Sequence, residues 1–345
     1  MTKKCIITTG VGANSKLWLS SDYYDTYTVS TLPCGVYDLF SIATDEAGNW
    51  VAVGRQFAAS YGEVFYSHDD GLTWTLSDVN ALIGDRDLMY VATDKSGNWV
   101  AVSTANAMVG YAVIIMSTDN GETWSIVHTC NEGGYLDAHG VAYGDGAWIA
   151  NNTHRIYRST DGSTWSVVYT NTDVTFQHVA TDGDGIWCIA AEFGDYYDGV
   201  LEDYPGQIYR SSNNGANWSL TYQATSLYFF QCFGTDGNGN WCVGCNGYYD
   251  DGYILRSVND GVDWSLVYTH PVENFIFNVA TSEDGTWLAS SSSDDDALIL
   301  RSTDAGATWS VLSSGTSVNC TYGIAYGGAT CPTGTILVGA GVTFF

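Results

Sequence analysis

Short apolar runs separated by turns rich in Gly, Asp and Asn recur along the whole chain, and no stretch shows the spacing of an amphipathic helix. In the first complete unit, these runs predict an inner strand at 39–44 and a second strand at 49–54 after a glycine turn. A third strand is expected at 63–67, and a fourth at 73–77 begins beside a tryptophan. The pattern therefore predicts an all-β protein built from repeated four-stranded units.

A decapeptide marks the end of each unit. RSTDAGATWS at 301–310 has close copies at 66–75, 116–125, 210–219 and 256–265, and a copy with a shorter turn ends the unit at 159–165. The copies share an acidic or amide residue (Asp69, Asp119, Asp161, Asn213, Asn259 and Asp304) and a tryptophan (Trp74, Trp124, Trp165, Trp218, Trp264 and Trp309). A degenerate copy contains Asp22 and ends at Tyr27, which brings the expected number of copies to seven.

A second element precedes each full copy, as in IATDEAGNWVAVG at 42–54, and a last version stands at 324–339. Equivalent positions are roughly 40 to 54 residues apart, a spacing typical of propeller blades rather than of helical repeats. We therefore expect a single domain over residues 1–345, folded as a seven-bladed β-propeller of four-stranded antiparallel blades.

The motif Ser-x-Asp-x-Gly-x-Thr-Trp resembles the Asp-box (BNR) repeat. This repeat occurs in sialidases, sortilin-type receptors, some glycoside hydrolases, a photosystem assembly factor and many phage or bacterial surface proteins. The resemblance extends over essentially the whole chain and implies the propeller fold. It implies little about function, because one fold carries many activities.

The turn chemistry of the motif indicates a structural role. Ser and Asp two residues apart can hydrogen-bond backbone groups of the turn, Gly71 and its counterparts allow a positive φ, and the Trp covers the hairpin. Asn213 and Asn259 keep the acceptor oxygen of the aspartate without its charge. This exchange is expected if the geometry of the turn matters and catalysis does not.

Both ends of the chain are expected to share the closing blade. The N-terminal part supplies a third and a fourth strand around 16–30, and TYGIAYG at 321–327 resembles an inner strand. Residues 5–10 and 335–342 both resemble second strands, so one of them is redundant. We expect the redundant one to pack as an extra edge or to contact another molecule.

The net charge of the chain disfavours some classes of binding partner. Asp and Glu number 38 against 11 Lys and Arg, a formal charge of −27, which disfavours nucleic acid and anionic membranes. No apolar run is long enough to span a bilayer, so membrane insertion is not expected. The apolar run Cys5-Ile6-Ile7 is too short for a signal peptide, and nine cysteines favour synthesis in a reducing cytoplasm over a disulfide framework.

Candidate ligand-binding residues lie in the irregular loops. In a four-stranded blade, the first and third turns share one face of the disc, so the variable second loops lie on the other, where binding is usual. Two of these loops carry paired tyrosines flanked by acids: Asp195, Tyr196, Tyr197 and Asp198, and Tyr248, Tyr249, Asp250 and Asp251. The tyrosines offer rigid area for a sugar or a protein, or they pack within their own loops. The acids could hold calcium, or they are solvated surface charge; no other cofactor is expected.

Other chemistry receives less support from the sequence. Arg158, Arg210, Arg256 and Arg301 each precede a box serine, so they lie one per blade and are not expected to converge on one anion. Sialidases also carry an Arg-Ile-Pro motif near the N-terminus, which this chain lacks.

Neither the cysteines nor the acids form a specific catalytic or metal-binding motif. Cys242 and Cys245 spell C-x-x-C, but on a strand they point to opposite faces, which favours core thiols over a metal site. Glu192 or Glu202 could act as the acid of a glycosidase, although acids are too abundant for their pairing to identify one.

The residues favour a non-enzymatic propeller of a bacteriophage particle that binds a host surface glycan or protein, or another virion protein. The missing signal peptide fits such a particle, because lysis releases it. The alternative is a glycoside hydrolase or lyase that acts on polysaccharide, with two converging acids on the variable face. A photosystem-type assembly factor is disfavoured by the acidic charge.

Overall fold

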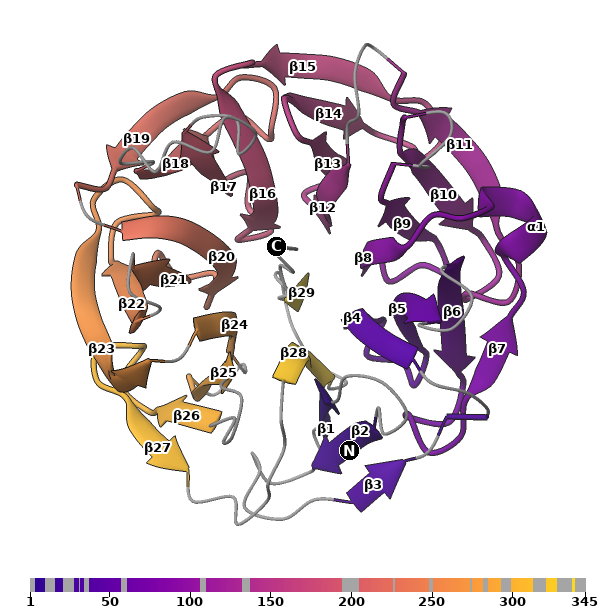
Figure 1. The fold of residues 1–345 in the computed structure, drawn as a ribbon, viewed down its shortest axis with the longest axis horizontal. Helices are drawn as coiled ribbons and strands as arrows, with labels where there is room; N and C mark the ends of the chain where they lie inside the picture. Colours follow the sequence, from indigo (N-terminus) through magenta and orange to yellow (C-terminus); the bar gives the residue numbers. More distant parts are fainter. Residues whose placement is uncertain are drawn as a thin grey trace.

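The computed structural model describes most of the chain. The described residues are 4–9, 16–20, 28–30, 32–33, 37–56, 61–105, 110–131, 137–193, 205–225, 227–247, 251–273, 275–281, 285–292, 299–312, 321–327 and 337–338. They form strands, apart from turns and the single helical turn α1 (Asn80–Ile83). The strands are arranged as sheets around a central axis, as Figure 1 shows.

Six sheets are antiparallel blades of four strands, each ordered from the inner edge to the outer edge. We name each blade by its inner strand. The strands are β4 (Tyr37–Thr44), β5 (Trp50–Gln56), β6 (Tyr61–Ser67) and β7 (Thr75–Ser77); β8 (Leu88–Thr93), β9 (Trp99–Ser103), β10 (Val113–Ser117) and β11 (Ser125–Thr129); β12 (Ala138–Gly144), β13 (Ala147–Asn152), β14 (Arg155–Ser159) and β15 (Ser166–Thr170). The other three blades contain β16 (Val174–Thr181), β17 (Trp187–Phe193), β18 (Gly206–Ser211) and β19 (Ser219–Gln223); β20 (Leu227–Thr235), β21 (Trp241–Gly247), β22 (Asp251–Ser257) and β23 (Ser265–Glu273); β24 (Phe275–Thr281), β25 (Trp287–Ser292), β26 (Ile299–Ser302) and β27 (Ser310–Leu312).

The remaining sheet has five strands and combines both ends of the chain. Its order is β29 (Leu337–Val338), β28 (Thr321–Gly327), β1 (Lys4–Thr9), β2 (Lys16–Ser20) and β3 (Thr28–Ser30). Figure 1 shows this sheet between the β24 and β4 blades. The expectation of seven four-stranded blades is therefore corrected to six. The physical reason is that both candidate second strands are used: β1 takes the second place, between β28 and β2, and β29 is an extra strand at the inner edge of β28.

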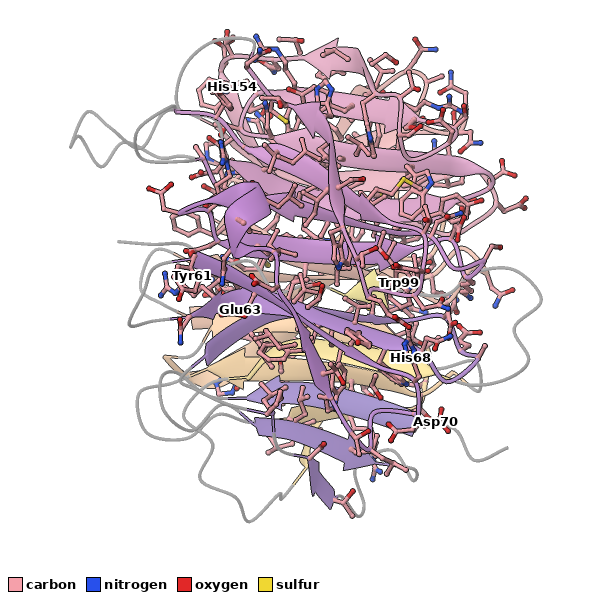
Figure 2. The ribbon with its side chains drawn as sticks, turned by 90° about the vertical axis from the view of Figure 1, so that its right-hand side faces the viewer. Tyr61, Glu63, His68, Asp70, Trp99 and His154 are labelled. Carbon is pink, nitrogen blue, oxygen red and sulfur yellow. The ribbon has the colours of Figure 1, made fainter. Side chains whose placement is uncertain are left out.

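The turns sort onto two faces of the disc. In four blades the box turn donates a backbone hydrogen bond to the turn between the first and second strands, as in Asp70 N–H to the Gly48 carbonyl (3.0 Å). Figure 2 shows His68 and Asp70 on this side, which we call the box face, and Tyr61 and His154 on the opposite side. The second and third strands of each blade are joined on that opposite side, which we call the loop face.

Buried side chains between adjacent blades form the core. A tryptophan begins or nearly begins the second strand of all six blades, and each is at most 2% exposed: Trp50, Trp99, Trp148, Trp187, Trp241 and Trp287. Box glycines come so close to the preceding blade that a side chain has no room. A Cβ on Gly261 would lie 2.5 Å from the Cys188 Sγ atom, and the φ of Gly261 is +75°. These glycines are needed for close approach as well as for backbone conformation.

Arginines beside the box serines connect neighbouring blades. Arg158, Arg210 and Arg256 each donate from Nε to a backbone carbonyl in the box turn of the next blade, namely Asn214 (2.9 Å), Asp260 (2.6 Å) and Ala305 (2.7 Å). These three guanidinium groups thus bind separate carbonyls at successive blade interfaces. They do not converge on a common anion site, in agreement with their spacing in the sequence.

The substitution Ala305→Asn is expected to stabilise the protein by about 1–2 kcal/mol. Ala305 has a φ of +58°, a conformation that Asn adopts more readily than Ala. Its counterpart Asn214 accepts a hydrogen bond from the Trp187 indole at 3.2 Å, whereas the buried Nε1 of Trp287 has no hydrogen-bond partner among the described residues. Urea unfolding of both proteins measures the gain. Ala305→Gly is the control, because it relieves the backbone but offers no acceptor; an equal gain in both variants would contradict the role of the hydrogen bond.

Candidate functional site

The box residues hydrogen-bond within their own turns. In the β4 blade, Asp69 accepts bonds from the Thr73 backbone N–H (2.8 Å) and hydroxyl (2.6 Å), and Ser67 donates to Asp69 while it accepts from the Gly71 N–H. The Trp74 indole donates to the Gly71 carbonyl at 3.0 Å. The equivalent indoles Trp124, Trp165, Trp218, Trp264 and Trp309 make the same bond at 2.8–3.1 Å.

Hydrogen bonds keep the box carboxylates ionised. The Thr308 hydroxyl and N–H hold the pKa of Asp304 at about 2, and the same kind of donors lower the pKa of Asp69 and Asp119 despite partial burial. In the shorter turn of the β12 blade, Asp161 accepts directly from the backbone N–H groups of Ser163 and Thr164, which lower its pKa further. Asn213 and Asn259 accept the equivalent backbone bonds, from Asn217 and Asp263, without a charge.

Most of the predicted ligand-binding residues lie outside the described residues, namely Asp195, Tyr196, Tyr197, Asp198, Tyr248, Tyr249 and Asp250, as does the box residue Asp22. Asp251 is the first residue of β22, where its backbone pairs with Glu273. The strands on either side of the two segments are described. One segment follows β17 and precedes β18, and the other follows β21 and precedes β22; these strand pairs belong to adjacent blades and are joined on the loop face.

A bulge occurs at the same place in every inner strand, a feature that the sequence analysis missed. In each sheet, the pairing register between the inner strand and the second strand shifts at or beside one residue of the inner strand. These residues are Phe40, Met89, His139, Gln177, Gln231, Phe277 and Tyr322. Each of these residues stands four positions before the last residue of the inner-strand motif. In the first blade, the bulge residue is Phe40 and the motif ends at Thr44. Bulges redirect side chains and are frequent beside binding and active sites. They lie toward the loop face, because every inner strand runs from that face to the box face.

Two aromatic side chains from separate blades meet next to these bulges. The Tyr90 ring of β8 lies 5.6 Å from the His178 ring of β16, centroid to centroid. Both side chains are at most 3% exposed. β12 lies between β8 and β16 in the ring, and its residue at the equivalent position is Gly140, which has no side chain to separate the two rings.

His178 is neutral in this site. Its Nδ1 accepts a hydrogen bond from the Phe233 N–H at 3.2 Å, so the ring proton is on Nε2. Burial lowers the pKa of His178 to about 3, which keeps the imidazole uncharged at neutral pH. The pair therefore offers uncharged polar groups near the axis of the propeller.

Two carboxyl groups have strongly raised pKa values. Burial and the nearby Asp78 carboxylate raise the pKa of Glu63 to about 7, and burial raises that of Glu192 to about 8, although Gln177 hydrogen-bonds the Glu192 carboxylate. Glu192 stands next to the end of β17, beside the exposed Phe193 from which the first tyrosine segment departs. Glu63 belongs to the β4 blade and Glu192 to the β16 blade, so these two acids do not form a pair.

Glu192→Gln is expected to stabilise the protein at pH 9 by about 1–2 kcal/mol and to change little at pH 5. The pKa of Glu192 in the folded chain is about 8, above its ordinary value of 4.5. Folding stability is therefore lost as pH rises from about 5 through 8, where the buried carboxyl must ionise, and Gln avoids this loss. Urea unfolding at both pH values provides the measurement. Asp184→Asn removes an exposed charge and is the control; a pH-independent effect of Glu192→Gln would refute this assignment.

Five cysteines of the described chain are buried: Cys130, Cys188, Cys232, Cys242 and Cys245. Cys188, Cys232, Cys242 and Cys245 carry free thiols, and burial raises the pKa of Cys232 to about 12. Cys242 lies beneath Gly306 of the next blade, and Cys245 donates to the Tyr253 carbonyl, so the C-x-x-C pair is part of the core. Among the described residues, no group of three or more His, Cys, Asp or Glu side chains could hold a metal ion. No helix in this part of the chain is long and apolar enough to cross a membrane.

Comparisons with known proteins support the repeat and the fold. A family model described as BNR/Asp-box repeat matches residues 65–76, and no curated protein matches the chain. Among solved structures, a GH74 xyloglucanase from Xanthomonas campestris has a TM-score of 0.61 at 15% identity and covers 80% of this chain. The chain spans about half of that enzyme, 47% of its length.

Two further structures align over nearly their whole length. YCF48 from Cyanidioschyzon merolae has a TM-score of 0.59 at 15% identity and covers 89% of this chain and 96% of its own. A protein described as a putative 6-phosphogluconolactonase from Bacteroides uniformis has a TM-score of 0.62 at 13% identity and covers 94% of this chain and 100% of its own. At these identities the likeness concerns the fold alone. None of the three is a phage protein, so the predicted resemblance to phage surface proteins finds no support in them.

Proposed function

We propose that this protein is a non-enzymatic binding propeller that recognises a glycan or a protein through its loop face. The observation that carries the proposal is the position of the strands before and after the two segments with paired tyrosines. These are the second and third strands of the adjacent β16 and β20 blades, which are joined on the loop face. Rigid blades that present neighbouring loops are a common basis for recognition.

The chemistry of these segments favours a neutral or basic partner. Tyrosine offers a flat apolar ring with a polar hydroxyl, which suits sugars and protein surfaces. The formal charge of −27 opposes anionic partners at long range and attracts basic ones. A neutral glycan or a basic patch of a protein fits the face, whereas nucleic acid does not.

We place the protein on a bacteriophage particle, where its partner is a host surface molecule or another virion protein. The supporting features are the irregular tyrosine-rich loops on one face and the strongly acidic charge, which keeps a surface protein soluble. Mass spectrometry of purified particles tests this placement. Particles of the phage that encodes the gene, free of the chain after gradient purification, would disprove it.

Binding is tested with the purified chain on a glycan array and on immobilised host envelope fractions. The variants Tyr196→Ala with Tyr197→Ala, and Tyr248→Ala with Tyr249→Ala, are each expected to weaken binding at least tenfold. Leu72→Ser is the matched control, because Leu72 is 60% exposed on the box face and its change leaves the loop face intact. Equal loss of binding in the control, or no binding by the unmodified chain to any probe, counts against the proposal.

A polysaccharide hydrolase is the second candidate, and one observation favours it. Glu192 holds its proton at neutral pH because its pKa is about 8, as a general acid requires, and it stands at the base of a loop-face segment. Release of reducing ends from a panel of polysaccharides measures this activity. Abolition of turnover by Glu192→Gln, with folding retained, would establish the hydrolase; inactivity of the unmodified chain on the whole panel leaves the binding role.

A further inference from the structure

The β16 blade lacks, on the box face, a hydrogen-bond donor that three other blades have. In those blades, the turn after the inner strand contains an aspartate and, four residues later, an asparagine that donates from Nδ2 to the aspartate Oδ2 atom. The pairs are Asn49 with Asp45, Asn98 with Asp94 and Asn240 with Asp236, at 2.5–2.8 Å. The β16 blade has Ile186 in place of the asparagine, so Asp182 receives no such bond.

Asp182 is therefore a buried carboxylate with one oxygen left over. The residue is 6% exposed, and the described residues give its side chain two hydrogen bonds, from the N–H groups of Asp184 and Ile186, which both end on Oδ1. Burial raises the pKa of Asp182, and the neighbouring Asp260 and Asp184 carboxylates raise it as well. Within the described part of the chain, no lysine or arginine forms an ion pair with Asp182. A cation at this place would relieve the repulsion and bind the free oxygen.

Asp260 comes from the box turn of the next blade. The β16 and β20 blades are neighbours in the ring, as Figure 1 shows. Arg210 of the β16 blade fixes the turn, because its Nε donates to the Asp260 carbonyl at 2.6 Å. Asp182 and Asp184 from one blade and Asp260 from the next thus meet at one blade interface on the box face. We call these three residues the acid cluster.

The box turn that contains Asp260 also exposes two apolar side chains. Val258 is 62% exposed and Val262 is 44% exposed. The turn itself does not require a valine at position 258, because the other four-stranded blades have polar residues there: His68, Thr118, Thr160, Ser212 and Thr303. Those turns form the same bond from the box glycine N–H to the box serine. Exposed apolar side chains that are rimmed by polar groups are typical of protein interaction sites.

We propose that the box face at the interface of the β16 and β20 blades is a docking surface for a basic segment of a partner protein. A Lys or Arg side chain of the partner pairs with the acid cluster, and adjacent apolar side chains of the partner cover the two valines. Charge complementarity selects this occupant, because the formal charge of −27 repels a second copy of the chain and any acidic partner. The surface lies opposite the loop face, so the proposal stands without recognition by that face.

The test uses the full chain and a fluorescent peptide of twelve alternating lysine and leucine residues. Fluorescence anisotropy is measured at about 0.15 M salt, where the Debye length is about 8 Å and attraction by distant charges is screened. The double variant Val258→Thr with Asp260→Asn is expected to weaken binding at least tenfold. It should fold, because the β8 blade has Thr118 and Asn120 at these positions, and Asn120 has the same positive φ as Asp260.

Glu122→Gln is the matched control, because it removes one charge from the box turn of the β8 blade, where the side chain is half exposed. It is expected to change binding less than twofold. A peptide with glutamate in place of lysine should not bind, and one with serine in place of leucine should bind at least tenfold more weakly. Equal loss of binding in the control and the double variant, or no binding of the lysine and leucine peptide to the unmodified chain, would overturn the proposal.

Ile186→Asn separates docking from a structural role of the acid cluster. The new amide is expected to donate to Asp182 Oδ2, as Asn240 does for Asp236, and so to occupy the oxygen that the partner would use. Peptide binding should therefore fall at least threefold, whereas urea unfolding should show a more stable protein. A more stable variant that binds the peptide as tightly as the unmodified chain would contradict the role of Asp182.

Discussion

Gly261→Ala is expected to destabilise the protein by about 2–5 kcal/mol, an effect far larger than that of most surface changes. Two terms add. The φ of Gly261 is +75°, a conformation that costs Ala about 1–2 kcal/mol. The new Cβ would also lie 2.5 Å from the Cys188 Sγ atom, which is completely buried in the preceding blade. Either the thiol or the box turn must move, so the interface between the β16 and β20 blades opens.

The two terms are separated by a matched control. Gly146 has a similar φ of +71°, but a Cβ there would meet nothing within 4 Å, so Gly146→Ala reports the backbone cost alone. Combining Gly261→Ala with Cys188→Ala should recover part of the loss, with a coupling of about 1–2 kcal/mol in a double-mutant cycle. Urea unfolding, followed by tryptophan fluorescence, measures the free energy of unfolding of Gly146→Ala, Gly261→Ala, Cys188→Ala and the double variant. Equal losses in Gly146→Ala and Gly261→Ala would show that the box turn does not pack against the preceding blade.

Removal of residues 1–10 is expected to abolish cooperative folding, because β1 joins the two ends of the chain. β1 pairs with β2 on one side, as in Ile7 with Trp18, and with β28 on the other, as in Ile7 with Ile324. Without β1, the facing edges of β2 and β28 lose their backbone hydrogen bonds, and β28 is no longer joined to the N-terminal strands. The cost should exceed the roughly 5–15 kcal/mol of total stability of an ordinary domain.

The truncation is measured by near-ultraviolet circular dichroism and thermal unfolding. A synthetic peptide of residues 1–12 added to the truncated chain should restore the folded signal, because the vacant place accepts a strand of that sequence by the same ladders. A peptide with Ile7 replaced by Pro is the control. A truncated chain that unfolds cooperatively at the original temperature would contradict the central position of β1.

Local features of the repeat could be predicted from the sequence because they depend on neighbouring residues. The Asp69 and Trp74 bonds to Thr73 and Gly71 lie within a few residues of one another, so a copy of the motif defines the turn wherever it stands. The strand ranges follow for the same reason: 39–44, 49–54 and 63–67 fall within β4, β5 and β6, apart from boundary residues. The placement of the loops on one face follows from strand alternation.

The candidate site was only partly predictable. The sequence predicts that the two tyrosine segments occupy equivalent loops, and this stays a prediction because both segments lie outside the described residues. It does not indicate that Glu192 keeps its proton, because the pKa of that carboxyl depends on burial by other parts of the fold. The position four residues before Thr44 varies from Phe to His to Gln along the repeats, so the inner-strand bulges have no common residue that a sequence pattern could detect.

The sequence by itself thus determined the blade, the box turn and the strand order within each repeat, since these rest on contacts between near neighbours. Only the tertiary structure decided which of two similar segments became the second strand of the closing sheet, since β1 and β29 pair with opposite edges of the same β28. It alone also gave Arg210 its partner, a carbonyl fifty residues away in the next blade. Such choices depend on which surfaces the closed ring brings together, and a repeat pattern carries no information about that closure.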